Sequence, residues 1–304
     1  MPENNLKQAM LPVGGTVFEN NHGTAPGAAL EKNGKCVIIL PGPPGELVPM
    51  FNESVRGFLK KYSDGAIVSH TVNIIGMGES SVAEEIEDMF DAKNPTVAPY
   101  AKSGEVRLRI TAKSETADDA DKMCAPVVDE ICSRLGDVVY GTDMNSIEER
   151  VVALLKEKGK KIATAESCTA GYIPKRLTDI PGASEVFECG IVSYSNDIKT
   201  KLLGVSPKTL ETYGAVSEQT AREMALGAKH VSGADIAIST TGLAGPGGDG
   251  VLPGGLSFAA VTDGERTVVE KIVTGHENDR EYNRYVTASR ALNLARLMLE
   301  EKMK

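Results

Sequence analysis

Strand-like and helix-like segments alternate throughout residues 145–304, and this alternation limits the possible fold more than any other feature. Buried-type runs such as KIATA (161–165), FECGIVSYS (187–195) and ADIAISTTG (234–242) are separated by segments with helical spacing of apolar residues. Such interleaving is typical of a sheet covered by helices on both faces. We therefore expect a three-layer α/β domain, whose ligands would bind beyond the carboxyl ends of its strands.

The other elements of this domain follow from the same periodicity. Ser146 stands three residues before Glu149, which is a capping box at the start of an amphipathic helix. The remaining expected elements are helices at 196–204, 217–233 and from about Asp279, and strands at 255–263 and 266–275.

Residues 66–144 have a different pattern, with the order β-α-β-β-α-β that predicts a small split-βαβ α+β domain. Gly76 and Gly78 do not form the GxxG clamp with which a KH module holds nucleotides. The first helix of this segment is acidic. A structural or interface role is therefore favoured over RNA binding.

Residues 1–65 are rich in Gly, Pro and Asn. KCVIIL (35–40) predicts one buried strand, PGPPGE (41–46) a loop, and the segment 46–62 a helix with Pro49 in its first turn, where proline is tolerated. One strand and one helix do not make a stable domain of this type. We expect this segment to be the end of a larger unit.

Charge and cysteine usage exclude several classes of protein. The net charge of −9 disfavours a nucleic-acid or membrane partner held by bulk charge. The five cysteines are scattered and form no CxxC or Cys/His spacing, which predicts reduced thiols and no metal site. Since no signal peptide or membrane-spanning stretch is recognisable, we expect a cytoplasmic protein.

The stretch TAESCTAG (164–171) joins a short strand to an expected helix. Ser167 is either a nucleophile or a helix cap, and Thr169 would serve as a cap equally well. A serine hydroxyl needs a neighbouring base to become nucleophilic. None of the four histidines follows a loop suited to carry that base; they are His22, His70, His230 and His276.

Lysine can act as the base where desolvation lowers its pKa. Lys199 lies one helical turn beyond SYSN (193–196), although a solvated lysine is the ordinary interpretation. Cys168 is a rival nucleophile because a helix N-terminus favours a thiolate, and Glu166 and Lys199 would complete a Cys-Glu-Lys set. A buried, inert cysteine is the favoured interpretation of Cys168.

The turn TTGLAGPGGDG (240–250) follows a buried strand and places hydroxyl groups and glycines close together. Its backbone N–H groups would suit an anion, whereas a mobile surface loop is the other interpretation. The turn matches neither a dinucleotide fingerprint nor a P-loop. Arg280 offers a bidentate phosphate contact, although exposed charge is common at such positions.

Together these motifs resemble the CinA family. TAESCTAG, FECGIVSYSNDIKTKLLGV, YGAVSEQTAREMA and GADIAISTTGLAGPGGD look like the CinA carboxy-terminal domain, in that order and spacing. The segment 66–144 resembles the KH-like connector of that family. NNLKQAMLP, NNHGTAPG and LPGPPGE resemble the end of its molybdopterin-binding-like domain, shortened at the front.

The resemblance implies an amidohydrolase that converts nicotinamide mononucleotide to nicotinate mononucleotide and ammonia, without a cofactor or metal. It implies Ser167 as nucleophile, Lys199 as general base and Tyr194 as a nearby donor, with amides at the start of the Thr169 helix stabilising the oxyanion. Glu166 would hold Lys199 or only pack at the strand end. The implied substrate-binding residues are Glu166, Thr169, Asn196, Thr241, Gly242 and Arg280.

The family also implies a homodimer and leaves a second function open, that of a competence- or damage-associated interaction protein with a vestigial site. Two departures from the family pattern bear on substrate affinity. LPGG (252–255) stands where the family has KPVG, and NDR (278–280) where it has GDR.

Overall fold

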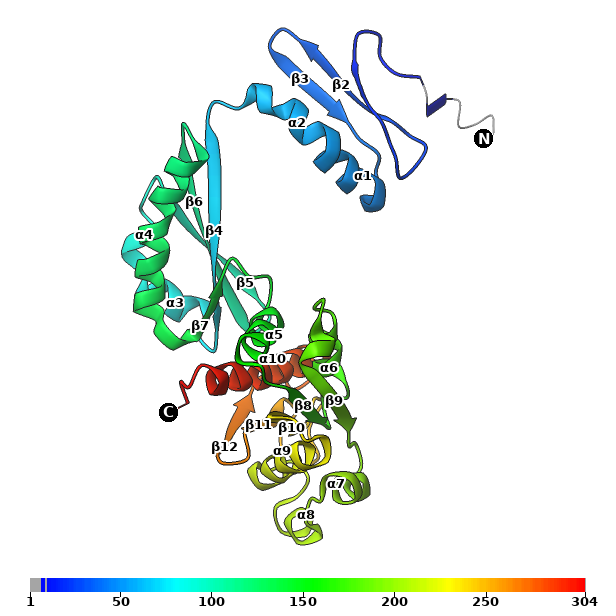
Figure 1. The fold of residues 1–304 in the computed structure, drawn as a ribbon, viewed down its shortest axis with the longest axis vertical. Coiled ribbons are helices and arrows are strands. Elements are labelled where there is room, and N and C mark those ends of the chain that lie inside the picture. Colours follow the sequence, from blue (N-terminus) through cyan, green and yellow to red (C-terminus); the bar gives the residue numbers. More distant parts are fainter. Residues whose placement is uncertain (1–6, 9, 304) are drawn as a thin grey trace. The chain divides into compact units, whose positions relative to one another are not determined.

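The computed structural model describes residues 7–8 and 10–303, and the chain divides into two compact units at Ala66. Figure 1 shows the elements of both units in chain order. The first unit ends with Ala66 and the second comprises residues 67–304.

The first unit is a three-stranded antiparallel sheet, β1 (Thr16–Phe18), β2 (Gly27–Lys32) and β3 (Lys35–Ile39), with one helical segment. That segment runs through α1 (Pro44–Met50), η2 (Phe51–Val55), α2 (Arg56–Leu59) and η3 (Lys60–Tyr62). Phe18, Ala29, Met50 and Val55 form its small core.

Two expectations for the first unit were wrong. The sequence indicated a single strand, but β1 and β2 pair beside β3. Glycine and alanine begin β2, so this strand lacks the β-branched and aromatic residues by which strands are recognised. The helix also begins at Pro44 rather than Glu46, which leaves Pro49 inside the helix instead of in its first turn.

The first part of the second unit confirms the order β-α-β-β-α-β. Its elements are β4 (Ala66–Ile75), α3 (Glu79–Glu85), η4 (Glu87–Met89), β5 (Thr96–Lys102), β6 (Glu105–Ser114), α4 (Ala117–Leu135), η5 (Gly136–Val138) and β7 (Val139–Thr142). The strands form a four-stranded sheet in the order β5-β6-β4-β7. Residues of β4 and β6, including Ile74 and Leu108, pack against Cys124 and Ile131 of α4.

The remainder is the expected three-layer α/β domain. Its five-stranded sheet has the order β12-β11-β10-β8-β9. The strands are β8 (Ile162–Glu166), β9 (Phe187–Val192), β10 (Ile236–Gly242), β11 (Leu256–Thr262) and β12 (Thr267–Val273). The helices are α5 (Ile147–Lys158), α6 (Tyr172–Thr178), η6 (Ala183–Glu185), α7 (Asn196–Leu203), α8 (Pro207–Tyr213), α9 (Glu218–Ser232) and α10 (Arg280–Leu299). Helix α8 is an addition to the expected set.

Alternate residues of the central strands supply the two faces of the sheet. Ile162 of β8 packs in the core that includes Leu155 of α5 and Leu292 of α10. Its neighbour Ala163 packs in a separate core with Met224 of α9. Successive side chains of a strand point to opposite faces of the sheet. Because helices cover both faces of this sheet, the central strands consist of short runs of buried residues.

The parallel pairing of the central strands determines where the loops meet. Strand β8 runs parallel to both β9 and β10, and Glu166 at its end is paired with Val192 and with Thr240. The carboxyl ends of these three strands therefore lie at one edge of the sheet, together with the loops that follow them. Within the described residues 7–8 and 10–303, no helix has the length and apolarity needed to cross a membrane.

Candidate active site at the end of the central strands

Ser167 and Lys199 meet at this edge of the sheet. Nζ of Lys199 lies 3.1 Å from Oγ of Ser167, and it also donates to the carbonyl oxygens of Ser193 (2.9 Å) and Tyr194 (3.3 Å). Only 1% of the Lys199 surface is exposed. Burial lowers the pKa of this amine below its ordinary value, because the charged form loses hydration. A neutral amine within reach of a hydroxyl can act as its base.

Local sequence explains how Lys199 reaches this position. The backbone N–H of Ser193 donates to the carbonyl oxygen of Glu166 at 2.8 Å, which extends the pairing of β9 with β8. Ser195 then caps α7, since its Oγ accepts a hydrogen bond from the N–H of Ile198 at 3.3 Å. Lys199 follows in the first turns of α7 and points back over the strand ends.

A cavity of about 330 Å³ opens beside this pair. Its wall contains Ser167, Cys168, Tyr194, Lys199, Thr241 and Arg280, and residues 242–248. Of the expected site residues, Glu166, Thr169 and Asn196 are not part of this wall. Asn196 is exposed and lines another hollow with Asp197 and Thr200. Asn196 is the first residue of α7.

Arg280 and Tyr194 form the outer part of the cavity. Nη1 of Arg280 donates to the carbonyl oxygen of Gly245 at 2.8 Å, and Nη2 lies 3.4 Å from the hydroxyl oxygen of Tyr194. Tyr194 is 62% exposed. A guanidinium and a phenol are thus available to a polar ligand at the mouth of the cavity.

Thr241 and Gly242 line the cavity through the end of β10. The Thr241 hydroxyl donates to the carbonyl oxygen of Ala215 at 2.6 Å, so it fastens the segment before α9 to the sheet. A Cβ atom at Gly242 would lie 2.4 Å from Cβ of Ser257 on β11. Close packing against β11 therefore requires glycine at position 242, whatever binds in the cavity.

Glu166 does not hold Lys199, one of the two roles considered for it. Its side chain is fully buried on the other side of the strand end, where Oε2 accepts from the N–H of Ile173 at 3.2 Å. Oε1 has no hydrogen-bond partner among the described residues. Burial raises the pKa of the Glu166 carboxyl, and nearby amides at the start of α6 oppose that shift.

The expected helix after Ser167 begins later than predicted. Helix α6 starts at Tyr172 with Gly171 at its N-cap, so neither Ser167 nor Thr169 caps it. Thr169 instead shares a hydrogen bond of 2.6 Å with the Thr240 hydroxyl. The N–H of Tyr172 donates to the Thr169 carbonyl oxygen and that of Ile173 to Glu166. These two amides are therefore already engaged, and the helix does not begin at Thr169; an oxyanion site made by other amides of this loop stays a prediction.

Cys168 is the buried cysteine that the sequence favoured, and the rival placement at a helix start is wrong. It lies four residues before α6 rather than at a helix N-terminus, and it is 6% exposed. Burial raises the pKa of the Cys168 thiol to about 12. A thiol with such a pKa is protonated near neutral pH and is a poor nucleophile.

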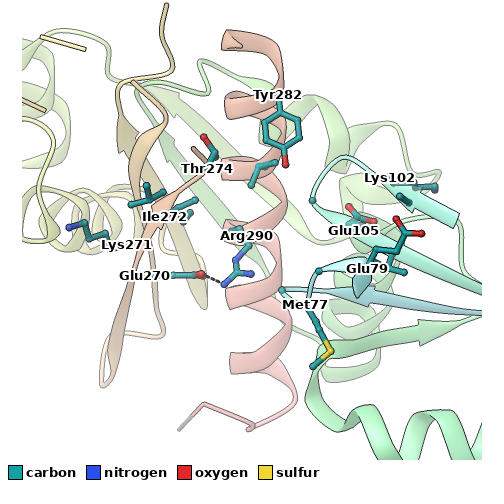
Figure 2. Close-up of a pocket in the computed structure, with 17 residues that line it drawn as sticks. Met77, Glu79, Lys102, Glu105, Glu270, Lys271, Ile272, Thr274, Tyr282 and Arg290 are labelled. Atoms are coloured by element: carbon teal, nitrogen blue, oxygen red, sulfur yellow. Dashed lines mark hydrogen bonds and ion pairs between the residues drawn. The ribbon is translucent and has the colours of Figure 1, made fainter. Parts of the chain in front are cut away.

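A larger cavity of about 430 Å³ lies elsewhere in the second unit, beside α10 and β12 (Figure 2). Figure 2 shows Glu79, Lys102 and Glu105 on one side of it, and Arg290 in an ion pair with Glu270 on the other. Its lining contains no serine, cysteine or histidine and no pairing of a nucleophile with a base. The cavity at Ser167 is therefore the better candidate for chemistry.

Metal ligands do not gather at either cavity. Over the part of the chain that the structure describes, no group of three or more His, Cys, Asp or Glu side chains could hold a metal ion.

Sequence reasoning missed Arg284. Its Nη2 donates to the carbonyl oxygen of Thr169 at 2.7 Å, within the loop that carries Ser167. Arg284 follows Arg280 by four residues, and residues at this spacing share a face of a helix. This spacing could have pointed to Arg284 once Arg280 was a site candidate.

Comparison with known proteins identifies the family. Residues 144–299 match the family model "CinA C-terminal domain", and residues 69–141 match "Damage-inducible protein CinA KH domain". The chain is 53% identical, over 91% of its length and 68% of the relative's, to a Clostridium beijerinckii protein whose name describes it as competence-damage inducible. It is 46% identical to a CinA-like protein of Desulfovibrio desulfuricans, over 96% of this chain and 70% of that one.

A solved structure is also similar. The crystal structure of the competence/damage inducible protein CihA from Agrobacterium tumefaciens aligns with 51% of this chain and 93% of its own, at 38% identity and a TM-score of 0.49.

Proposed function

This chain belongs to the CinA family, and we propose that it hydrolyses the carboxamide of nicotinamide mononucleotide to nicotinate mononucleotide and ammonia. The contact between Ser167 and Lys199 carries this proposal: a hydroxyl lies 3.1 Å from a buried amine whose pKa is lowered. This pairing supplies the base that a serine nucleophile needs. Among the residues that the structure describes, no histidine is hydrogen-bonded to Ser167.

The reaction would proceed in two stages. Neutral Lys199 takes the proton of the Ser167 hydroxyl as Oγ attacks the amide carbon, and the protonated amine returns this proton to the departing nitrogen. Ammonia leaves and an ester joins Ser167 to the nicotinoyl group. Water then attacks the ester with Lys199 again as base, which releases nicotinate mononucleotide and restores the Ser167 hydroxyl.

The cavity wall supports the choice of a phosphorylated, amide-bearing substrate. A volume of about 330 Å³ lies within the range of about 300–1,000 Å³ that is usual for small-molecule sites. Arg280 would pair with the phosphate, as guanidinium groups do in bidentate contacts. The Tyr194 hydroxyl, beside Arg280, would donate to a polar group of the substrate.

Incubation of the purified chain with nicotinamide mononucleotide tests the proposal. We expect nicotinate mononucleotide and ammonia in equal amounts. Failure to form either product would reject it.

A second candidate is a competence- or damage-associated interaction protein with an inactive site, favoured by the names of the relatives. The Ser167→Ala variant separates the two when it is titrated with nicotinamide mononucleotide. A rise in thermal stability on titration is expected for an amidase whose binding site is intact. No rise would favour the interaction protein.

A further inference from the structure

The loop that carries Ser167 has an unusual backbone. After Ser167, the chain passes through Ala170 with φ of 49° and Gly171 with φ of 86° before α6 begins. Left-handed backbone is routine for glycine but costs roughly 1–2 kcal/mol for a residue with a Cβ atom. The conformation of Ala170 therefore persists only if other contacts hold the loop.

Strand β10 holds one side of this loop. The N–H of Ser167 donates to the carbonyl oxygen of Thr240 at 2.9 Å. The hydroxyl of Thr169 shares a hydrogen bond with the hydroxyl of the same threonine. These two contacts fix the loop near its beginning, before Ala170.

Helix α10 supplies the third attachment. Nη2 of Arg284 donates to the Thr169 carbonyl oxygen at 2.7 Å, immediately before Ala170. A hydrogen bond from a charged donor is about twice as strong as a neutral one.

The guanidinium carbon of Arg284 also lies 5.7 Å from the centre of the Tyr172 ring, at the start of α6. Nε of Arg284 is buried and has no hydrogen-bond partner among the described residues. The guanidinium is thus held at the loop even though one of its donors stays unpaired.

Arg280 and Arg284 together fasten both walls of the cavity to one helix. Arg280 donates to the carbonyl oxygen of Gly245, in the glycine-rich loop after β10. Arg284, one turn later, donates to the loop that carries the nucleophile. Residues four apart lie on the same helix face, so the first two turns of α10 bind both loops.

We propose that Arg284 is a positioning residue, which holds the loop of residues 167–171 so that the Ser167 hydroxyl stays within reach of Lys199. The inference rests on the proposed amidase function. Arg284 acts through the Thr169 carbonyl oxygen and does not itself line the cavity. Its loss should slow attack by Ser167 while substrate affinity is kept, because the phosphate-facing Arg280 is untouched.

The test compares Arg284→Met with Arg284→Lys and with Arg290→Met. Arg290 is a matched control, since it is an arginine of the same helix and pairs with Glu270 at the other cavity (Figure 2). Two rates are measured: turnover of nicotinamide mononucleotide, and modification of Ser167 by a fluorophosphonate, followed by peptide mass. Modification needs an activated Ser167 but no natural substrate.

We expect Arg284→Met to lower kcat and the modification rate by about ten- to a hundredfold, as small misplacements of reacting groups do, with KM within about twofold. The pH profile of the modification should keep its midpoint, because the contacts of Lys199 are unchanged. Arg284→Lys should recover part of the rate, since it retains a charged donor, and Arg290→Met should behave like the wild type.

Full rates in a folded Arg284→Met chain would overturn the proposal, and so would an equal loss in Arg290→Met. If the wild type is modified at Ser167 but releases no ammonia, the amidase proposal fails while the comparison of modification rates still decides the role of Arg284. A wild-type chain that shows neither modification nor turnover would overturn both.

Discussion

Nζ of Lys199 lies 3.1 Å from Oγ of Ser167, although 32 positions separate the two residues in the chain. Parallel pairing of β8 with β9 produces this proximity, because each residue follows the carboxyl end of its strand. The amine lies in a buried setting, among the carbonyl oxygens of Ser193 and Tyr194. The fold thus places a buried amine, rather than a histidine, beside the Ser167 hydroxyl.

The pH dependence of turnover follows from the burial of Lys199. Its pKa is lowered from the ordinary 10.5 by desolvation, and only the neutral amine can accept the proton of Ser167. We expect kcat/KM to rise with pH and to reach half its maximum below pH 10.5.

The Lys199→Arg substitution tests the same point, since guanidinium groups stay protonated in proteins. A loss of about 10²–10⁴-fold in kcat/KM is expected, which is the usual contribution of a general base. Lys201→Arg, at an exposed position of the same helix, is the control and should keep full activity. A flat pH profile, or an active Lys199→Arg chain, would argue against this base.

Arg280 should matter mainly for substrates that carry a phosphate. We expect Arg280→Met to raise KM for nicotinamide mononucleotide by about ten- to a hundredfold, since a hydrogen bond to a charged group contributes about 1.5–3 kcal/mol. Nicotinamide riboside lacks the phosphate and serves as the internal control. Because Arg280 also binds Gly245, an equal loss on both substrates would assign it to the loop rather than to phosphate recognition.

Much of this arrangement could be predicted from the sequence, because it depends on local patterns. Apolar runs such as KIATA mark the central strands, and strand ends mark the candidate loops. The position of Lys199 beside Ser167 then follows from parallel strand order. Capping by Ser195 is similarly local, since its hydroxyl bonds an amide three residues later.

Other features depend on contacts between distant segments, and the sequence did not predict them. Arg284 and Thr169 are 115 positions apart, and no local pattern joins them. The rival placement of Cys168 at a helix start is wrong, because the two left-handed residues before Tyr172 delay α6, and burial raises the pKa of its thiol. Strand β2 lacks strand-forming residues and is stabilised by its pairing with both neighbours.

His70 should make stability depend on pH. Its Nδ1 lies 2.6 Å from Asp143 and its Nε2 2.8 Å from Asp121, and these carboxylates raise its pKa above 6.5. The stabilisation by charged His70 is therefore complete below pH 6.5 and is lost as pH rises through the raised pKa. The pKa of Asp143 is lowered, so its contribution is present above pH 3.8 and is lost at lower pH.

Urea unfolding at about pH 6 and about pH 8 checks this dependence. His70→Gln should remove the advantage of the wild type at the lower pH, by about 0.2–1 kcal/mol in view of the partial exposure of these groups. If the difference between the two chains is the same at both pH values, the pKa of His70 is the same in the folded and unfolded chains, and the carboxylates do not raise it.

Glu105 should contribute to the stability of the second unit. Its buried carboxylate accepts hydrogen bonds from the hydroxyls of Tyr140 (2.9 Å), Tyr285 (3.2 Å) and Ser289 (3.4 Å). Glu105→Ala would leave the buried Tyr140 hydroxyl without this acceptor, at a cost of about 1–3 kcal/mol.

Urea unfolding of matched variants measures this contribution. Glu105→Gln keeps one acceptor oxygen and should lose less stability than Glu105→Ala. Glu79→Ala, which removes an exposed carboxylate of the same cavity (Figure 2), should lose little. Equal stabilities of Glu105→Ala and Glu79→Ala would show that the hydroxyl contacts contribute nothing.

The assignment of Ser167 as the nucleophile is tested most directly by ammonia release from nicotinamide mononucleotide in three chains: wild type, Ser167→Ala and Cys168→Ala. The pKa of about 12 of the buried Cys168 thiol leaves it protonated, whereas the Lys199 amine, the proposed base, lies 3.1 Å from the Ser167 hydroxyl. We expect release by the wild type and by Cys168→Ala, and none by Ser167→Ala above the rate without protein. Undiminished release by Ser167→Ala, or its loss in a folded Cys168→Ala chain, would contradict the Ser-Lys mechanism.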